Sequence, residues 1–137
     1  MLRKLLEKLS RGIAFKKKLT AEFERRTIFV SPEGGGLRYW KPSLASIDPM
    51  LLNVVRNYVK PRATVWDVGG NLGFFALTAA IKSKGNIVVF EPDLSLAHLL
   101  RKTADANPDL DISIIPLAVS NNDGIALFNI AERARST

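Results

Sequence analysis

A glycine-rich turn that holds one acid and one amide is the segment of this sequence whose residue types and spacing could do chemistry. It reads acid-x-Gly-x-Asn-x-Gly between two apolar runs, and it contains Asp67, Gly69, Gly70, Asn71 and Gly73. Glycine permits a tight turn, and because it has no Cβ a ligand can approach its backbone closely. In doubly wound α/β folds, ligands bind at such turns, outside the carboxyl ends of the strands. The segment therefore predicts a ligand site, with a tight connection that binds nothing as the alternative.

The spacing of the glycines indicates which ligands the turn does not suit. The dinucleotide pattern G-x-G-x-x-G needs three glycines, and the chain has Gly69, Asn71 and Phe74 at those positions. No Gly-Lys-Ser/Thr follows, so a phosphate-binding loop is not expected. Asp67 suits a cationic or polar amino-acid group. Glu91, 18 residues beyond the last glycine of the turn, stands where an acid can accept both hydroxyls of a ribose. We expect a nucleoside-type cofactor.

The elements that must position these residues alternate between strands and helices. In chain order, the pattern predicts strand 64–68, helix 74–84 closed by Gly85, strand 87–90, a helix capped by Asp93 that runs to about residue 106, and strand 112–115. The first strand is apolar enough to be buried on both faces. This alternation predicts an α/β fold, a partial Rossmann-like doubly wound parallel sheet with crossover helices.

Further elements are expected on either side of this alternation. Asp48 caps a helix whose first residue is Pro49, a combination typical of helix starts. Before it, the short β-prone runs 27–30 and 37–40 predict a β-hairpin, and after the parallel sheet residues 125–130 predict a fourth strand.

Basic residues concentrate at the N-terminus. Residues 1–26 hold nine Lys or Arg and three Glu, and apolar residues recur at helical spacing from Leu2 to Ile13, which predicts a short basic amphipathic helix. We therefore expect residues 1–26 to be an extension and residues 27–137 to be one cofactor-binding domain. The favoured interpretation is that the apolar stripe packs on the domain. Binding to an anionic membrane surface is an alternative, and binding to nucleic acid is a less favoured one.

The composition excludes several classes of site. The chain has 137 residues and no cysteine, which predicts one domain without disulfides, thiolate metal sites or cysteine nucleophiles. The single histidine, His98, cannot form a multi-histidine metal site by itself, and no metal is expected. No run approaches the roughly 20 apolar residues that span a bilayer. We expect a cytoplasmic protein, peripheral to a membrane if residues 1–26 bind one.

From about residue 48 onward the chain resembles the FkbM-type methyltransferases, a branch of the S-adenosylmethionine-dependent class I fold. The likeness is carried by Asp48–Leu52, Tyr58–Pro61, Val65–Gly73, Phe90–Pro92, Pro116–Ser120 and Asp123–Gly124. The resemblance implies S-adenosylmethionine as the cofactor. It also implies a role for each site residue: Asp67, Gly69, Asn71 and Gly73 around the methionine part, with Gly70 in the same turn, Glu91 on the ribose, and Leu117 and Ala118 beside the adenine.

The same resemblance implies O-methyl transfer to a hydroxyl of a small molecule or a sugar, without naming a catalytic residue. One departure is Gly70, where the family usually has alanine. Another is that no acidic motif of a fourth core strand follows Ile130, so we expect the cofactor-binding half of such an enzyme, with an open edge on strand 64–68. A catalytically inactive cofactor-binding fragment and a basic surface-binding module stay open as alternatives.

Overall fold

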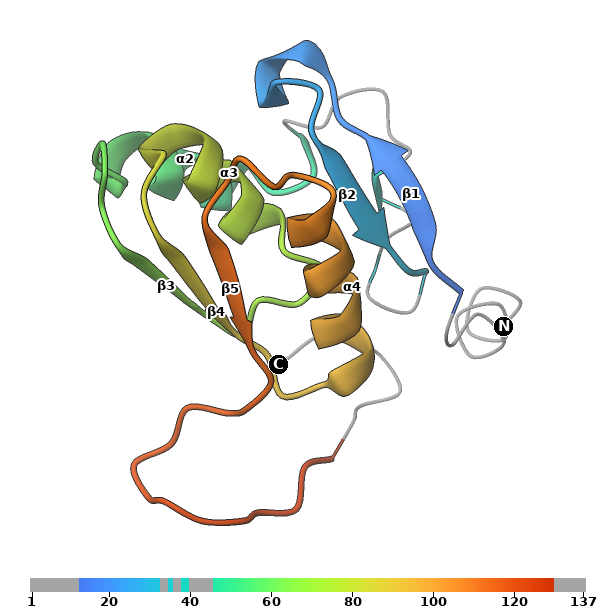
Figure 1. Ribbon diagram of the computed structural model, residues 1–137, viewed down its shortest axis with the longest axis vertical. Helices are drawn as coiled ribbons and strands as arrows, with labels where there is room; N and C mark the ends of the chain where they lie inside the picture. Colours follow the sequence, from blue (N-terminus) through green and yellow to red (C-terminus); the bar gives the residue numbers. More distant parts are fainter. Residues whose placement is uncertain (1–12, 33–34, 36–37, 40–45, 130–137) are drawn as a thin grey trace.

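The described part of the protein is a mixed α/β structure built on a three-stranded parallel sheet. The computed structural model describes residues 13–32, 35, 38–39 and 46–129 (Figure 1). The sheet contains β3 (Val65–Val68), β4 (Ile87–Phe90) and β5 (Ile112–Ile115), in that order. Val65 pairs with Ile87 and Ile87 with Ile112, so the carboxyl ends of the three strands lie at one edge. The three strands predicted for a partial Rossmann-like sheet are confirmed.

Three helices form where the sequence predicts them. They are α2 (Pro49–Tyr58), α3 (Phe74–Ser83) and α4 (Leu94–Asp105). The Asp48 carboxylate caps α2 by accepting a hydrogen bond from Leu51 N at 3.1 Å, and Asp93 caps α4 by accepting one from Ser95 N at 2.8 Å. These caps satisfy backbone amides that have no partner within the helix. None of the described helices is long and apolar enough to cross a membrane.

The parallel sheet is covered by helices on one face. Asp67, Ile87 and Val89 point toward α3 and α4 and are buried, whereas Trp66 and Val68 on the opposite face are 66% and 59% exposed. The prediction that the first strand is buried on both faces is therefore wrong. No described helix covers the second face, so the second helical layer of a doubly wound sheet is not found among the described residues (Figure 1).

The N-terminal hairpin forms from different strands than the sequence indicates. β2 (Thr27–Val30) pairs antiparallel with β1 (Phe15–Lys18), through a loop that includes the short helix η1 (Ala21–Phe23). The predicted partner, 37–40, is described only at Arg38 and Tyr39, which are not in a strand. The loop between β1 and β2 buries Leu19 and Phe23, and this burial favours the observed pairing.

The hairpin formed by β1 and β2 packs on α4. The described residues of the expected extension are therefore part of the same packed structure as the parallel sheet. In Figure 1, α4 lies between the parallel sheet and β2. Phe29 N donates to Thr103 Oγ1 at 3.0 Å, and Arg26 Nη2 pairs with Asp109 Oδ2 at 2.7 Å. The expected boundary at residue 26 thus does not mark a break in the described structure. The expected basic helix falls almost entirely on residues 1–12, outside the described residues.

The chain after β5 carries no regular element in its described part. Residues 116–129 form neither helix nor strand, and the side chains of Ile125 and Leu127 are 105% and 88% exposed. The predicted fourth strand is therefore wrong for residues 125–129, which form no ladder with any described strand although β3 and β5 are both edge strands; residue 130 lies outside the described residues.

Candidate functional site

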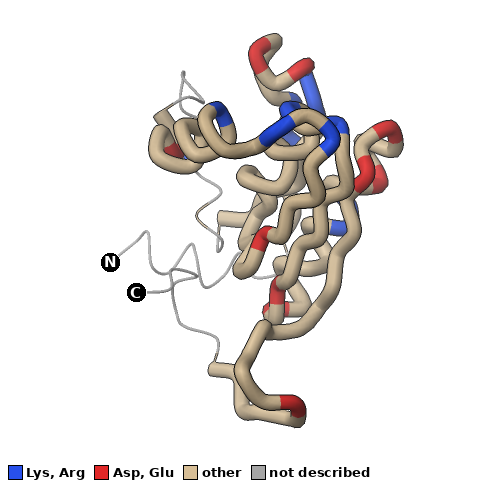
Figure 2. Tube along the Cα trace, turned by 90° about the vertical axis from the view of Figure 1, so that its left-hand side faces the viewer, with Lys and Arg blue, Asp and Glu red and all other residues tan. Residues whose placement is uncertain are grey.

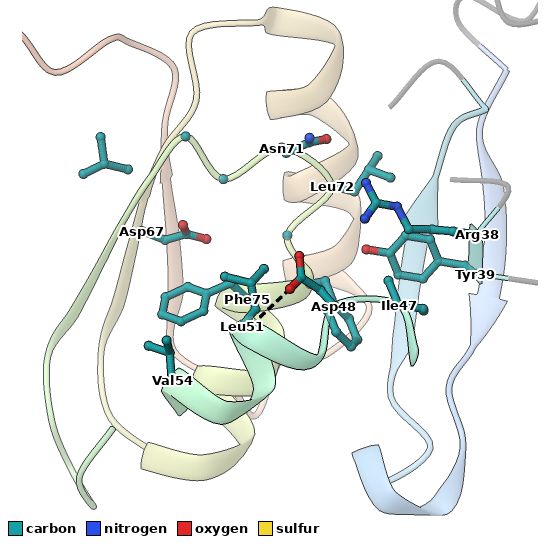
Figure 3. Close-up of a pocket in the computed structure, with 15 residues that line it drawn as sticks. Arg38, Tyr39, Ile47, Asp48, Leu51, Val54, Asp67, Asn71, Leu72 and Phe75 are labelled. Atoms are coloured by element: carbon teal, nitrogen blue, oxygen red, sulfur yellow. Dashed lines mark hydrogen bonds between the residues drawn. The ribbon is translucent and has the colours of Figure 1, made fainter. Parts of the chain in front are cut away.

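A cavity of about 420 Å³ opens where β3 ends, between the glycine turn and the start of α2 (Figure 3). That volume is in the range of small-molecule sites, about 300–1,000 Å³. Three parts of the chain form its wall: the end of β3 with the turn and the start of α3, one side of α2, and the segment before α2. The lining residues are Asp67–Phe75 from the first part, Asp48, Leu51 and Val54 from the second, and Arg38, Tyr39 and Ile47 from the third.

The turn needs glycine at two positions for different reasons. Gly69 has φ +86°, and nothing lies within 4 Å of where a Cβ would stand, so its backbone faces open space. A Cβ on Gly70 would lie 2.2 Å from Val89 Cγ1, which no real side chain tolerates. The amides of Gly69 and Gly70 both donate to Phe90 O, at 2.8 and 3.2 Å. The turn is thus fixed to β4 on one side and open to a ligand on the other.

Asp67 supplies an acceptor with no protein donor. The residue is 9% exposed, and its Oδ2 is buried without a hydrogen-bond partner among the described residues. Burial raises the pKa of Asp67 from its ordinary 3.8 to about 6; the backbone amide of Ala76 acts in the opposite sense, and the charge of Glu91 adds to the rise. Leaving a buried polar atom unpaired is costly, so Oδ2 is suited to accept a hydrogen bond from a bound ligand.

Glu91 lies behind the turn and does not line the cavity. Its Oε2 accepts from Asn71 N at 2.7 Å and its Oε1 accepts from Asp93 N at 2.9 Å, and the residue is 6% exposed. The carboxylate therefore joins the turn to the start of α4. The sequence predicts a ribose contact for Glu91, but its oxygens here serve backbone amides.

Leu117 and Ala118 also lie away from the cavity. They follow β5 in an exposed segment, where Leu117 is 49% exposed, and neither is part of the cavity wall. The structure thus brings together Asp67, Gly69, Gly70, Asn71 and Gly73, as the sequence predicts, and leaves Glu91, Leu117 and Ala118 outside the wall.

Three polar residues of the wall come from outside the predicted site. Arg38, Tyr39 and Asp48 line the side that faces the turn (Figure 3). Burial raises the pKa of the Tyr39 hydroxyl, as does the charge of Asp48, whereas the charge of Arg38 lowers it. The sequence indicates Asp48 only as a helix cap. The residue does cap α2, and it also lines the cavity. Arg38 and Tyr39 gave no such signal because their segment reads as a strand.

No protein-family model matches the chain, and no curated protein matches it either. Among the described residues, no group of three or more His, Asp or Glu side chains is arranged to hold a metal ion.

Proposed function

We propose that the cavity binds S-adenosylmethionine and that the chain is the cofactor-binding part of a methyltransferase. The observation that carries the proposal is the buried Asp67 Oδ2, which has no donor in the described protein and lies on the wall of a cavity beside the open backbone of Gly69. An ammonium group is a donor that would satisfy this oxygen with a charge-assisted hydrogen bond.

The fit differs between the two ends of the cofactor. The amino-acid end suits the wall formed by Asp67, Asp48 and the glycine turn, because carboxylates stabilise cationic groups. The ribose and adenine contacts predicted for Glu91 and for residues 117–118 are not assembled on the wall. The proposal therefore assigns binding by the described residues chiefly to the amino-acid and sulfonium groups.

Carboxylates lie where the parallel strands end. Figure 2 draws most Lys and Arg toward the opposite end of the molecule, where the strands begin, and several Asp and Glu are drawn at that end too. The strand ends and the segments that follow them carry Asp67, Glu91 and Asp93. When bound, S-adenosylmethionine supplies a methyl group on a sulfonium. The chain's own residues hold and orient the cofactor, and the proposed acceptor is a hydroxyl of a small molecule or a sugar.

Calorimetric titration tests the proposal. The purified chain should bind S-adenosylmethionine and S-adenosylhomocysteine more tightly than NAD, and tighter binding of NAD would refute it. Asp67→Asn should weaken the binding of S-adenosylmethionine by about 1.5–3 kcal/mol, the contribution of a hydrogen bond to a charged group. The control is Asp123→Asn, an exposed carboxylate after β5 that is absent from the cavity wall.

Methyl transfer is measured separately from binding. Radiolabelled methyl incorporation into hydroxyl acceptors would support the enzymatic part of the proposal. Tight cofactor binding without any incorporation would favour the alternative of a catalytically inactive cofactor-binding protein.

A further inference from the structure

A guanidinium lines the cavity on the side away from Asp67. Figure 3 draws the Arg38 guanidinium and the Asp67 carboxylate on opposite sides of the cavity that both residues line. Arg38 Nε donates to Gly35 O at 3.3 Å, and none of the ion pairs among the described residues involves Arg38. A partly buried guanidinium that has no carboxylate partner among the described residues is suited to bind an anionic group, because its planar fork matches a carboxylate.

The residue next to Arg38 holds its backbone in place. Tyr39 is 4% exposed and packs edge-on against Phe74, with ring centroids 5.7 Å apart and an interplanar angle of 81°. Phe74 is the first residue of α3, directly after the glycine turn. The Arg38 backbone is therefore held beside the turn, which lowers the part of the ordering cost that backbone motion would add when a ligand binds.

The charges on the cavity wall determine which anionic or zwitterionic ligands it can bind. Asp67 and Asp48 are carboxylates and Arg38 is a cation, and Figure 3 draws Asp48 between the other two. Two carboxylates disfavour a phosphate group by repulsion. S-adenosylmethionine carries the inverse set, which is an ammonium, a sulfonium and one carboxylate.

We propose that Arg38 binds the carboxylate of the cofactor's amino-acid end while Asp67 accepts a hydrogen bond from its ammonium. Arg38 is then a specificity determinant that recognises an intact α-amino acid group. This inference rests on the proposed function, because it assigns a residue to one group of the same ligand.

A pair of ligands that differ only in the carboxylate tests the assignment. S-adenosylmethionine and decarboxylated S-adenosylmethionine are titrated into the full chain, into Arg38→Ala and into the matched control Arg56→Ala. Arg56 is exposed on α2 and is not part of the cavity wall. The full chain should prefer the intact cofactor by about tenfold to a hundredfold, as for a charge-assisted hydrogen bond. Arg38→Ala should remove this preference by weakening the intact cofactor alone, and Arg56→Ala should keep it.

The outcomes separate the two proposals. If the unaltered chain binds both ligands equally well, no carboxylate is recognised and the assignment of Arg38 is wrong, whereas the proposed function stands. If Arg38→Ala weakens both ligands by the same factor, the residue is structural and the assignment is again wrong. If the unaltered chain binds neither ligand, the proposed function itself fails. Should Arg38→Ala not fold, the preference of the unaltered chain still decides whether a carboxylate is recognised.

Discussion

At the scale of single residues, Asp67 combines a proposed binding role with a cost in stability. Its pKa is raised to about 6 by burial, against an ordinary value of 3.8. Between these two pH values the folded protein binds more protons than the unfolded chain does, so its stability falls as the pH rises through this window. Above pH 6 the carboxylate is charged and buried without a full set of partners. A ligand with an ammonium group would offset this cost.

The first prediction is that Asp67→Asn stabilises the protein at neutral pH. The raised pKa corresponds to about 3 kcal/mol, at about 1.4 kcal/mol for each pH unit between 3.8 and about 6. Urea unfolding at pH 7.5 should show a gain of about 2–3 kcal/mol over the unaltered chain, and at pH 3.5 the gain should vanish. Asp123→Asn, at an exposed position, should change neither value. A gain that is independent of pH would mean that titration of Asp67 is not its cause.

The second prediction concerns Glu91, which the structure uses as a connector. Glu91→Ala leaves the amides of Asn71 and Asp93 without their acceptor, and each buried amide left unpaired costs about 1–3 kcal/mol. We expect the free energy of unfolding to fall by about 2–5 kcal/mol in urea titrations. The exposed Glu22→Ala should have little effect. Unchanged stability together with lost cofactor affinity would instead favour the ribose contact predicted from the sequence.

At the scale of elements, one side chain joins β2 to α4. Asn107 is 3% exposed; its Nδ2 donates to Thr27 O at 2.8 Å and to Thr103 O at 2.7 Å, and its Oδ1 accepts from Thr27 N at 3.3 Å. The amide thus caps the end of α4 and continues the hydrogen bonding of the hairpin. The Asn107 side chain thus anchors the N-terminal hairpin to α4.

The third prediction follows from these three hydrogen bonds. Asn107→Ala should lower the free energy of unfolding by about 2–4 kcal/mol, because it leaves buried backbone groups of Thr27 and Thr103 unpaired. The control is Asn57→Ala on α2, an exposed amide bonded to the side chain of Asn53. Chemical denaturation of both variants measures the difference. Equal effects would show that the hairpin is held by its apolar contacts alone.

The elements that the sequence predicts well are those specified by local chemistry. Asp48 and Asp93 cap helices because their carboxylates reach nearby backbone amides, which is a property of a few adjacent residues. The pairing of β1 could not be predicted in this way. Its residues include three consecutive lysines, Lys16–Lys18, which do not resemble a strand. The pairing depends on the burial of Leu19 and Phe23 against residues distant in the chain.

The site follows the same division. The glycine turn could be predicted because its spacing is local, and its five residues line the cavity. The role of Glu91 depends on where α4 begins in space. The place of Arg38 on the cavity wall depends on how its neighbour Tyr39 packs beside the turn. Neither fact can be inferred from the order of residue types along the sequence. The open second face of β3 is a third example, because an apolar run indicates burial without indicating what covers each face.

At the scale of the whole molecule, the N-terminal segment and the cavity are parts of one core. Leu19 and Phe23 are 3% and 6% exposed and belong to the same apolar cluster as Leu77 and Val89, from α3 and β4. Leu19 and Phe23 of the expected extension thus lie in the same core as the parallel sheet, and we expect removal of residues 15–26 to destabilise the fold. The same core orders the wall of the cavity, since it includes Tyr39.

The fourth prediction is that a change in this segment reaches the cavity. Phe23 packs on Phe74 with ring centroids 5.5 Å apart, and Phe74 also contacts Tyr39 and lines the cavity. Phe23→Ala should lower the free energy of unfolding by about 3–5 kcal/mol, as for other buried aromatic truncations. It should also weaken cofactor binding, because Phe74 and Tyr39 lose a packing partner, although Phe23 itself does not line the cavity. Lys16→Ala on β1, an exposed side chain, should alter neither property. Denaturation and calorimetry on the same samples measure both effects, and a destabilised variant with unchanged affinity would mean that the N-terminal segment stabilises the core without ordering the cavity wall.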